Sequence, residues 1–194
     1  MKEMGLETDE NRLLIGMVSR LVDHKGLDLV RYIFHDMMGD NASFVLLGSG
    51  DAEYENFFCE MQNRYPGRVA VRIGFIPSLS KKIYAGADAF LMPSKSEPCG
   101  LAQMVAARYG TLPIVRETGG LKDSIHDVGG ENGNGFTFKT YNAHDMLGAI
   151  RRAEGLFGNK ALWNEAMTDA MESDFSWKKS ANDYVNVYRM ILND

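Results

Sequence analysis

The stretch that decides the fold is "LLIGMVSRLVDHKGLDLVRYIFHDMM", residues 13–38. Its first seven residues, 13–19, form a short apolar run, which predicts a buried strand. From Gly26 onward, apolar side chains recur every three or four positions, which predicts a helix ending at Met38. A charged loop joins the two segments. The stretch therefore predicts one strand–helix unit of an α/β sheet.

The same alternation of strand and helix continues along most of the chain. Further strands are predicted at 42–50, 68–75, 88–94 and 111–117, and helices at 51–65, 78–87, 100–110, 143–157, 160–172 and 177–192. The strands are apolar throughout rather than alternating, as parallel strands covered on both faces should be. The glycine-rich segment 128–135 is predicted to be a loop. We therefore expect a Rossmann-like, doubly wound parallel sheet in one domain over residues 1–194.

Composition excludes several classes of protein. The chain has 194 residues, 45% of them hydrophobic, and a net charge of −5, which gives no indication of a nucleic-acid partner. Its two cysteines, Cys59 and Cys99, are too few for a disulfide scaffold, and no ligand cluster predicts a zinc site. The first residues are charged and contain no apolar run that could act as a signal peptide or membrane span. We therefore expect a cytoplasmic protein without membrane contact.

Polar or glycine-containing turns follow all five predicted strands. In open parallel sheets, ligands bind at the carboxyl ends of the strands, so these turns share the expected binding edge. The five segments are Arg20–Gly26, Gly48–Asp51, Phe75, Pro93–Gly100 and Arg116–Leu121. Their agreement on one edge is stronger evidence for a ligand site than any single turn.

The first turn places two cations, Arg20 and Lys25, beside the expected start of a helix. A guanidinium and an ammonium at such a point suit a diphosphate group, although the spacing fits a solvated basic turn equally well. Gly48 and Gly50 fit either a tight turn or a close ligand approach, and Asp51 is predicted to cap the next helix.

The segment "SKSEPCGLAQM", residues 94–104, combines a carboxylate and a thiol before a helix. No histidine lies near Cys99 in the sequence, and Cys59 is too far away for a redox pair, so a nucleophilic or redox role lacks support. Glu97 is then a candidate acceptor for sugar hydroxyls, and the N–H groups of Cys99, Gly100 and Leu101 are candidate donors. The alternative is that Glu97 is a structural cap.

A second glycine pair opens the helix expected in "VRETGGLKDSI", residues 115–125. Here the N–H groups of Gly119, Gly120 and Leu121 could bind hydroxyls or phosphate, or the pair could form a plain tight turn.

Taken together, these motifs resemble the family of glycogen and starch synthases that use ADP-glucose, the bacterial glycogen synthases above all. The similarity lies in "SRLVDHKGLDL", "LLGSGD", "AGADAFLMPSKSEPCGLAQMVAARYGTLPIVRETGGLKDSI", "NGNGFTF" and "FSWKKSANDYVNVY", and it runs from about Glu10 to the C-terminus. The family has the GT-B architecture of two Rossmann-like domains around a cleft. This chain resembles only the C-terminal, donor-binding half, so we expect an excised domain.

The resemblance implies a role for each candidate residue. Arg20 and Lys25 would hold the donor diphosphate, and Glu97 would bind glucose hydroxyls; these three form the expected catalytic set. The expected donor-binding set is Gly48, Gly50, Phe75, Cys99, Gly100, Leu101, Thr118, Gly119 and Gly120, with Phe75 stacking on adenine. Retaining enzymes outside this family carry a second glutamate eight positions after the first. Val105 occupies that position here, which leaves ribose recognition unassigned.

The implied reaction is retaining transfer of glucose from ADP-glucose to the 4-hydroxyl of an α-1,4-glucan, without a metal or other cofactor. The glucan would be held through the missing N-terminal domain, so the isolated chain would bind ADP or ADP-glucose and be inactive alone. Two alternatives stay open: the donor half of a UDP-sugar transferase, and a binding module without catalysis.

The last predicted helix, within 177–194, is amphipathic. Trp177, Tyr184, Val187 and Ile191 share one stripe. This stripe fits packing toward the absent N-terminal domain and packing on the chain's own sheet equally well.

Overall fold

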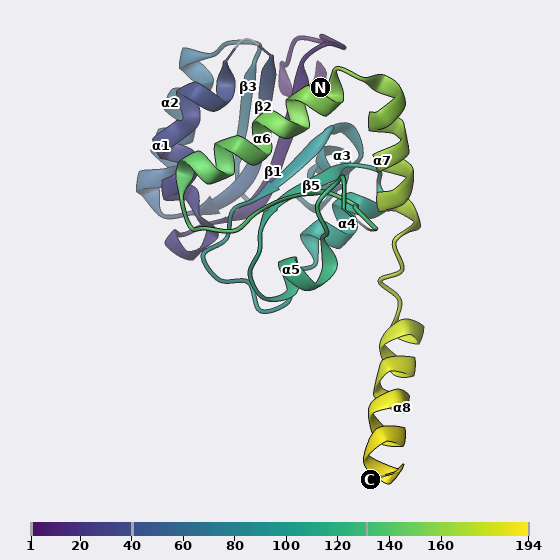
Figure 1. Ribbon diagram of the computed structural model, residues 1–194. Helices are drawn as coiled ribbons and strands as arrows, with labels where there is room; N and C mark the ends of the chain where they lie inside the picture. Colours follow the sequence, from purple (N-terminus) through teal and green to yellow (C-terminus); the bar gives the residue numbers. More distant parts are fainter. Residues whose placement is uncertain (1, 40, 131, 194) are drawn as a thin grey trace.

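The chain folds around a six-stranded, all-parallel sheet with the order β3-β2-β1-β4-β5-β6 (Figure 1). The computed structural model describes residues 2–39, 41–130 and 132–193. The strands are β1 Leu13–Leu21, β2 Ala42–Gly50, β3 Val69–Ile73, β4 Ala89–Met92, β5 Leu112–Arg116 and β6 Phe136–Phe138. This is the doubly wound order of dinucleotide-binding folds. The predicted fold class is confirmed.

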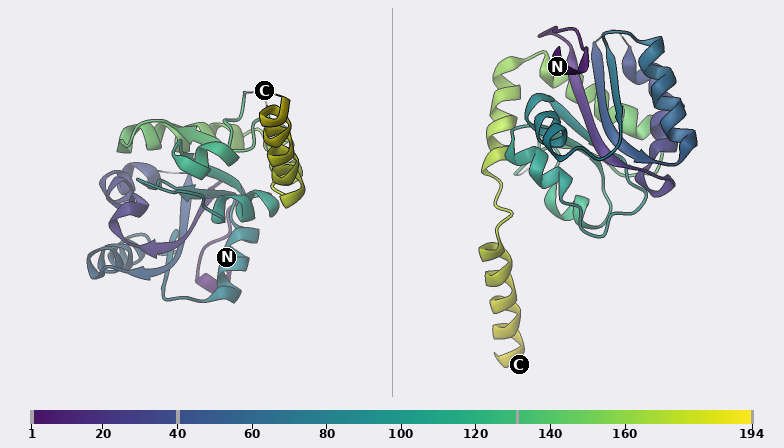
Figure 2. Two further views of the ribbon diagram at one scale, coloured as in Figure 1. Left: turned by 90° about the horizontal axis from the view of Figure 1, so that it is seen from below. Right: turned by 180° about the vertical axis from the view of Figure 1, so that it is seen from behind.

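Helices cover both faces of the sheet, as Figures 1 and 2 show. The α-helices are α1 Leu27–Met38, α2 Ala52–Arg64, α3 Pro77–Gly86, α4 Ala102–Arg108, α5 Gly119–Ser124, α6 Ala143–Phe157, α7 Lys160–Glu172 and α8 Trp177–Asn193. Two short 3-10 helices, η1 Lys2–Met4 and η2 Asp23–Lys25, precede β1 and α1. Helices α1, α2 and α6 pack into the larger core on one face, while α3 and α5 pack on the other.

The apolar runs of the sequence explain this core. The first five residues of β1 are buried, and α1 turns Leu27, Val30 and Phe34 onto the sheet. Phe34 is the centre of an aromatic cluster, with edge-on contacts to Phe44 of β2 and Phe58 of α2. Burial on both faces is why the strands read as continuous apolar runs.

The structure differs from the sequence-based predictions at three places. β1 continues to Leu21, so Arg20 lies in the strand and not in the following loop. Asp51 stands at the first position before α2, but its side chain makes no capping hydrogen bond; instead Glu55 reaches back to the Gly50 N–H at 2.8 Å. The edge strand β6 was not predicted, because three residues are too short to show a pattern.

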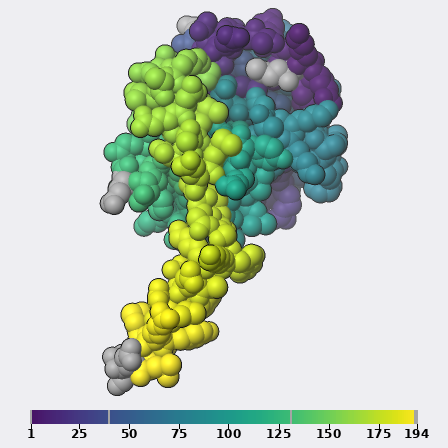
Figure 3. Space-filling model, turned by 90° about the vertical axis from the view of Figure 1, so that its right-hand side faces the viewer, coloured from purple at the N-terminus to yellow at the C-terminus, as the bar shows by residue number. Residues whose placement is uncertain are grey.

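Helix α8 stands apart from the rest of the molecule (Figures 2 and 3). Trp177 is 88% exposed, and Tyr184, Val187 and Ile191 of the predicted stripe are exposed as well. In the described structure the stripe does not pack on the chain's own sheet, which favours the alternative that it packs toward another domain. No helix in the described part of the chain is long and apolar enough to cross a membrane.

Candidate functional site

A small cavity of about 190 Å³ lies between the carboxyl ends of β1 and β4. This is the point where the strand order reverses, and in such sheets the crevice at the switch point is where ligands bind. Its lining includes Met17–Arg20 of β1, Leu91–Met92 of β4, and residues from the connections that follow these strands and the start of α4: Lys25, Ser94, Glu97, Gly100, Leu101 and Ala102. The sheet topology thus brings together residues that are about 75 positions apart in the sequence.

An ion pair forms part of the lining of this cavity. Lys25 Nζ lies 2.5 Å from Glu97 Oε2, and the two side chains are only 17% and 13% exposed. The hydroxyl of Ser94 donates to the same carboxylate oxygen at 3.3 Å. A pair this well shielded is strongly coupled, since removing either partner leaves a charge with little solvent around it. Lys25 still has N–H donors for a second anion, because an ammonium carries three.

Gly26 allows the two loops to meet. Its φ is +74°, and a Cβ atom there would lie 2.1 Å from the carbonyl oxygen of Pro93. Next to this contact, Lys95 N donates to His24 O at 2.9 Å. The loop after β1 and the loop after β4 therefore touch backbone to backbone, and this contact sets the separation of Lys25 and Glu97.

Arg20 is an exposed member of the cavity lining. Its Nη2 atom lies 3.5 Å from Nε2 of His24, which is the only hydrogen-bond partner of its guanidinium among the described residues. Since an Arg side chain carries five N–H donors, most of them remain for a ligand at the cavity mouth. His24 was not predicted as a site residue.

The segment from Cys99 to Leu101 leads from Glu97 into α4. Gly100 and Leu101 line the cavity, whereas Cys99 is exposed and outside it. Within the described residues, no acceptor is found for the backbone N–H groups of these three residues. The buried Gln103 amide fixes the segment from behind, donating to Cys99 O at 3.2 Å and Gly100 O at 3.1 Å.

The predicted glycines have packing roles in this structure. A Cβ at Gly48 would lie 2.0 Å from Ser19 O, and a Cβ at Gly50 would lie 2.3 Å from Leu21 O, so both are required by the approach of β1. Of the two alternatives for the second glycine pair, the Gly120 N–H favours the tight turn, because it is already hydrogen-bonded within the chain. It donates to Glu97 O at 3.1 Å and Pro98 O at 3.2 Å.

The other residues at the start of α5 are also held by contacts within the chain. The Leu121 N–H donates to Thr118 O at 3.1 Å, so it too is not open to a ligand. At Gly119, which has φ +44°, a Cβ would lie 2.2 Å from Glu97 O. Gly119 thus opens α5 directly against the loop that carries Glu97, with Thr118 at the position before the helix, and neither residue lines the small cavity.

Phe75 lies on the same sheet edge but outside the cavity lining. It follows β3, where Gly74 N donates to Gly48 O at 2.9 Å, and its side chain is 89% exposed. An aromatic ring so exposed at a ligand edge has a free face for stacking on a planar group.

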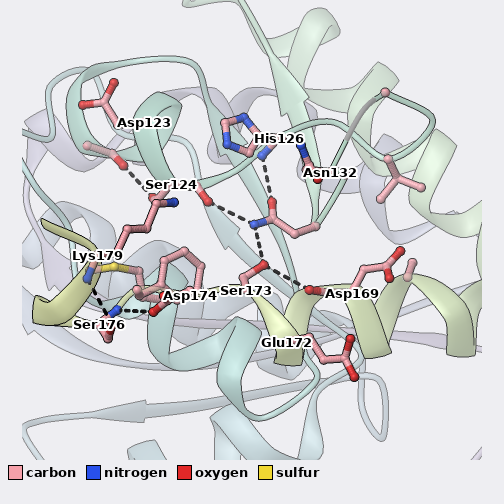
Figure 4. A pocket seen from close by; sticks show the side chains of 18 of the residues that line it. Asp123, Ser124, His126, Asn132, Asp169, Glu172, Ser173, Asp174, Ser176 and Lys179 are labelled. Atoms are coloured by element: carbon pink, nitrogen blue, oxygen red, sulfur yellow. Dashed lines mark hydrogen bonds between the residues drawn. The ribbon is translucent and has the colours of Figure 1, made fainter. Parts of the chain in front are cut away.

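A second, larger cavity of about 1310 Å³ lies on another side of these loops, shown in Figure 4. Its lining comes mainly from α5, α7, the 126–134 loop and the start of α8. Carboxylates dominate the charged side chains there: Asp123, Glu165, Asp169, Glu172, Asp174 and Asp183, against Lys179. A cavity of this charge disfavours a phosphate, whereas the smaller cavity is lined by two cations, Arg20 and Lys25, and suits one better.

The described residues contain no cluster of three or more His, Cys, Asp or Glu side chains placed to hold a metal ion.

A family model described as "Glycosyl transferases group 1" matches residues 3–156. The chain belongs to this family. Among its relatives, the glycogen synthase of Geobacillus thermodenitrificans is 49% identical over 98% of this chain. That of Clostridium acetobutylicum is 51% identical, also over 98%. The chain spans only 40% and 41% of the length of these two relatives.

The fold of this glycosyltransferase chain also matches a solved structure. The catalytic domain of starch synthase IV from Arabidopsis thaliana, solved bound to ADP and acarbose, superposes with a TM-score of 0.87 at 34% identity. The match covers 100% of this chain and 41% of that one. The fold is that of the C-terminal domain of a GT-B glycosyltransferase.

Proposed function

We propose that this chain is the donor-binding domain of a retaining glucosyltransferase that uses ADP-glucose to extend an α-1,4-glucan. The single observation that carries the proposal is the Lys25–Glu97 pair at the β1–β4 switch point, with Arg20 beside it. The two cations Arg20 and Lys25 suit a diphosphate, and a carboxylate suits sugar hydroxyls, so this cavity can recognise the diphosphate and the sugar of a nucleotide sugar.

The choice of ADP-glucose rests on the relatives. Glycogen synthases share about half of the residues of this chain, and the starch synthase IV structure contains ADP and acarbose, an oligosaccharide analogue. Because the chain spans about two-fifths of these proteins, the activity, the glucan partner and a cytoplasmic location are all part of the proposal.

The proposed chemistry follows from charge. Breaking the bond between the anomeric carbon and the diphosphate leaves negative charge on the departing ADP. Arg20 and Lys25 stand where they can stabilise that charge, so the mechanism we propose needs no metal or other cofactor. Glu97 orients the glucose through its hydroxyl groups. Excluding water requires closure against a second domain, onto which we expect the exposed stripe of α8 to pack.

Isothermal titration calorimetry with ADP tests the assignment. We expect ADP to bind the parent chain and the Arg20→Ala/Lys25→Ala double variant to bind at least about 100-fold more weakly, because each charged hydrogen bond contributes about 1.5–3 kcal/mol. Lys122→Ala, an exposed lysine on α5 away from the cavity, is the matched control and should bind like the parent.

Unchanged ADP affinity in the double variant would remove Arg20 and Lys25 from the site. Titrating UDP-glucose beside ADP-glucose separates the two donor classes, and a clear preference for the uridine nucleotide would overturn the ADP assignment. Absence of binding by either nucleotide sugar to the parent chain would contradict the proposed function as a whole.

A further inference from the structure

Arg116, the last residue of β5, holds the loop that carries Glu97 without lining the cavity. Its Nε donates to Ser94 O at 2.9 Å, and its Nη2 donates to Lys95 O at 2.5 Å. Two adjacent carbonyls are thus fixed by one planar fork, a geometry that a lysine cannot reproduce. In the sequence, Arg116 is only the first residue of a turn after a strand, and no motif predicts a role for it.

The ring of Tyr141 lies against the Arg116 guanidinium. The Arg116 guanidinium carbon lies 5.5 Å from the centre of the Tyr141 ring, and Lys95 Nζ lies 5.6 Å from it. The Tyr141 hydroxyl donates to Asp28 Oδ1 at 2.5 Å. Burial and this hydrogen bond raise the pKa of Tyr141 well above its usual 10, so the phenol remains a donor over the ordinary pH range.

This arrangement ties together three parts of the site. Arg116 belongs to β5, Tyr141 precedes α6, and Asp28 is in the first turn of α1, next to the segment that carries Lys25. The loop that they fix also meets the first one through Lys95 N and His24 O. Ser94, whose carbonyl Arg116 holds, donates its hydroxyl to the Glu97 carboxylate at 3.3 Å. Arg116 is therefore connected to that carboxylate through Ser94.

We propose that Arg116, seated on Tyr141, is a positioning residue for Glu97. It acts through the backbone of Ser94 and Lys95 and does not touch the donor. Its loss moves the carboxylate away from the sugar while Arg20 and Lys25 keep the diphosphate. The affinity ratio of ADP-glucose to ADP therefore reports on this residue, and this readout rests on the proposed function.

The test compares the Arg116→Lys and Tyr141→Phe variants with a control variant in which a comparable arginine is replaced. Arg152→Lys is that control, because Arg152 also donates to a backbone carbonyl, Thr137 O at 2.6 Å, and lies over an aromatic ring, that of Phe136. Calorimetry measures ADP and ADP-glucose affinity. NMR measures hydrogen exchange of the Lys95 amide, which needs no ligand, and thermal melting reports general damage.

We expect Arg116→Lys to lower the ADP-glucose to ADP affinity ratio about tenfold and to speed Lys95 exchange by a similar factor. Tyr141→Phe should do so about threefold, and Arg152→Lys should change neither. An unchanged ratio with unchanged Lys95 exchange overturns the proposal. The proposal is also overturned if the affinities for ADP and ADP-glucose fall equally and the melting temperature falls as it does in Arg152→Lys. That result would indicate general destabilisation.

Should the parent chain bind neither ADP nor ADP-glucose, the proposed function fails, and the positioning role is then decided by Lys95 exchange alone. Faster exchange in Arg116→Lys but not in Arg152→Lys supports it, and equal exchange overturns it.

Discussion

At the scale of single residues, Gly26 is the position on which the site depends most. It has the left-handed φ of +74°, and the space where a Cβ would stand is filled by the Pro93 carbonyl at 2.1 Å. We predict that Gly26→Ala destabilises the chain by about 1–3 kcal/mol from backbone strain, plus the cost of separating the two loops. Chemical denaturation measures this loss.

Gly155→Ala is the matched control for this change. Gly155 lies within α6, and nothing stands within 4 Å of the Cβ that alanine would add. Alanine there should stabilise the chain by about 0.5–1 kcal/mol, since glycine weakens a helix interior. The two Gly→Ala changes should therefore have opposite signs. A Gly26→Ala variant as stable as the parent would show that the loops are not held in contact.

Lys25 and Glu97 could be predicted as candidate site residues because they are charged and lie in turns that follow parallel strands, on the edge of the sheet where ligands bind. Their pairing was not predictable, since it depends on Gly26 and Pro93 meeting across the switch point. The hydrogen bonds of Arg116 and Gly120 could not be predicted for the same reason. Their partners are backbone carbonyls of a loop that is distant in the sequence, and no side-chain pattern marks them.

At the scale of elements, the start of α6 is fixed by two side chains. Asn142 Oδ1 accepts from His144 N at 2.8 Å and caps the helix, while Asp145 Oδ2 accepts from Thr140 N at 2.8 Å and from the Thr140 hydroxyl at 2.7 Å. These hydrogen bonds from Thr140 lower the pKa of Asp145 below its usual 3.8. The turn that carries Tyr141 therefore depends on an ionised carboxylate.

We predict that Asp145→Asn lowers the free energy of unfolding by about 1 kcal/mol at pH 7, because a charged acceptor is lost. The folded pKa is depressed, so the unfolded state binds more protons just below pH 3.8, and the parent's advantage is lost as pH falls through the folded pKa. Denaturation curves between pH 2 and pH 7 should converge at the acid end.

Asn142→Ala provides the comparison for that experiment. Its cost, about 1 kcal/mol for a lost cap, comes from a side chain that does not titrate and should not change over this pH range. A difference between Asp145→Asn and the parent that stays constant down to pH 2 would contradict the role given to the carboxylate.

Element types were predictable from the sequence and element boundaries were less so. Continuous apolar runs identified the first five strands correctly, because strands buried on both faces of the sheet are apolar throughout. The end of β1 was missed by two residues because Arg20 is polar although it still pairs with Ser49 of β2. Strand β6 depends on pairing with β5, which no run of three residues reveals.

At the scale of the whole molecule, α8 is the helix whose apolar stripe the described chain leaves uncovered. Its apolar side chains are exposed, and Leu192 reaches 83% exposure. Such a contiguous apolar surface marks an interaction site. The sequence predicted the amphipathic stripe but could not decide what covers it, because periodicity gives the face of a helix and not its partner.

We predict that a chain ending at Ser176 is as stable as the parent, within about 0.5 kcal/mol, because α8 adds little buried surface to the domain. The cut keeps Phe175, which packs against the core. Urea denaturation followed by Trp163 fluorescence measures this, since that buried residue is then the only tryptophan left. The exposed stripe should also make the parent self-associate with rising concentration in sedimentation velocity, while the shortened chain stays monomeric. A loss of more than about 1 kcal/mol on shortening would mean that α8 packs on its own domain, which the exposure of its apolar stripe argues against.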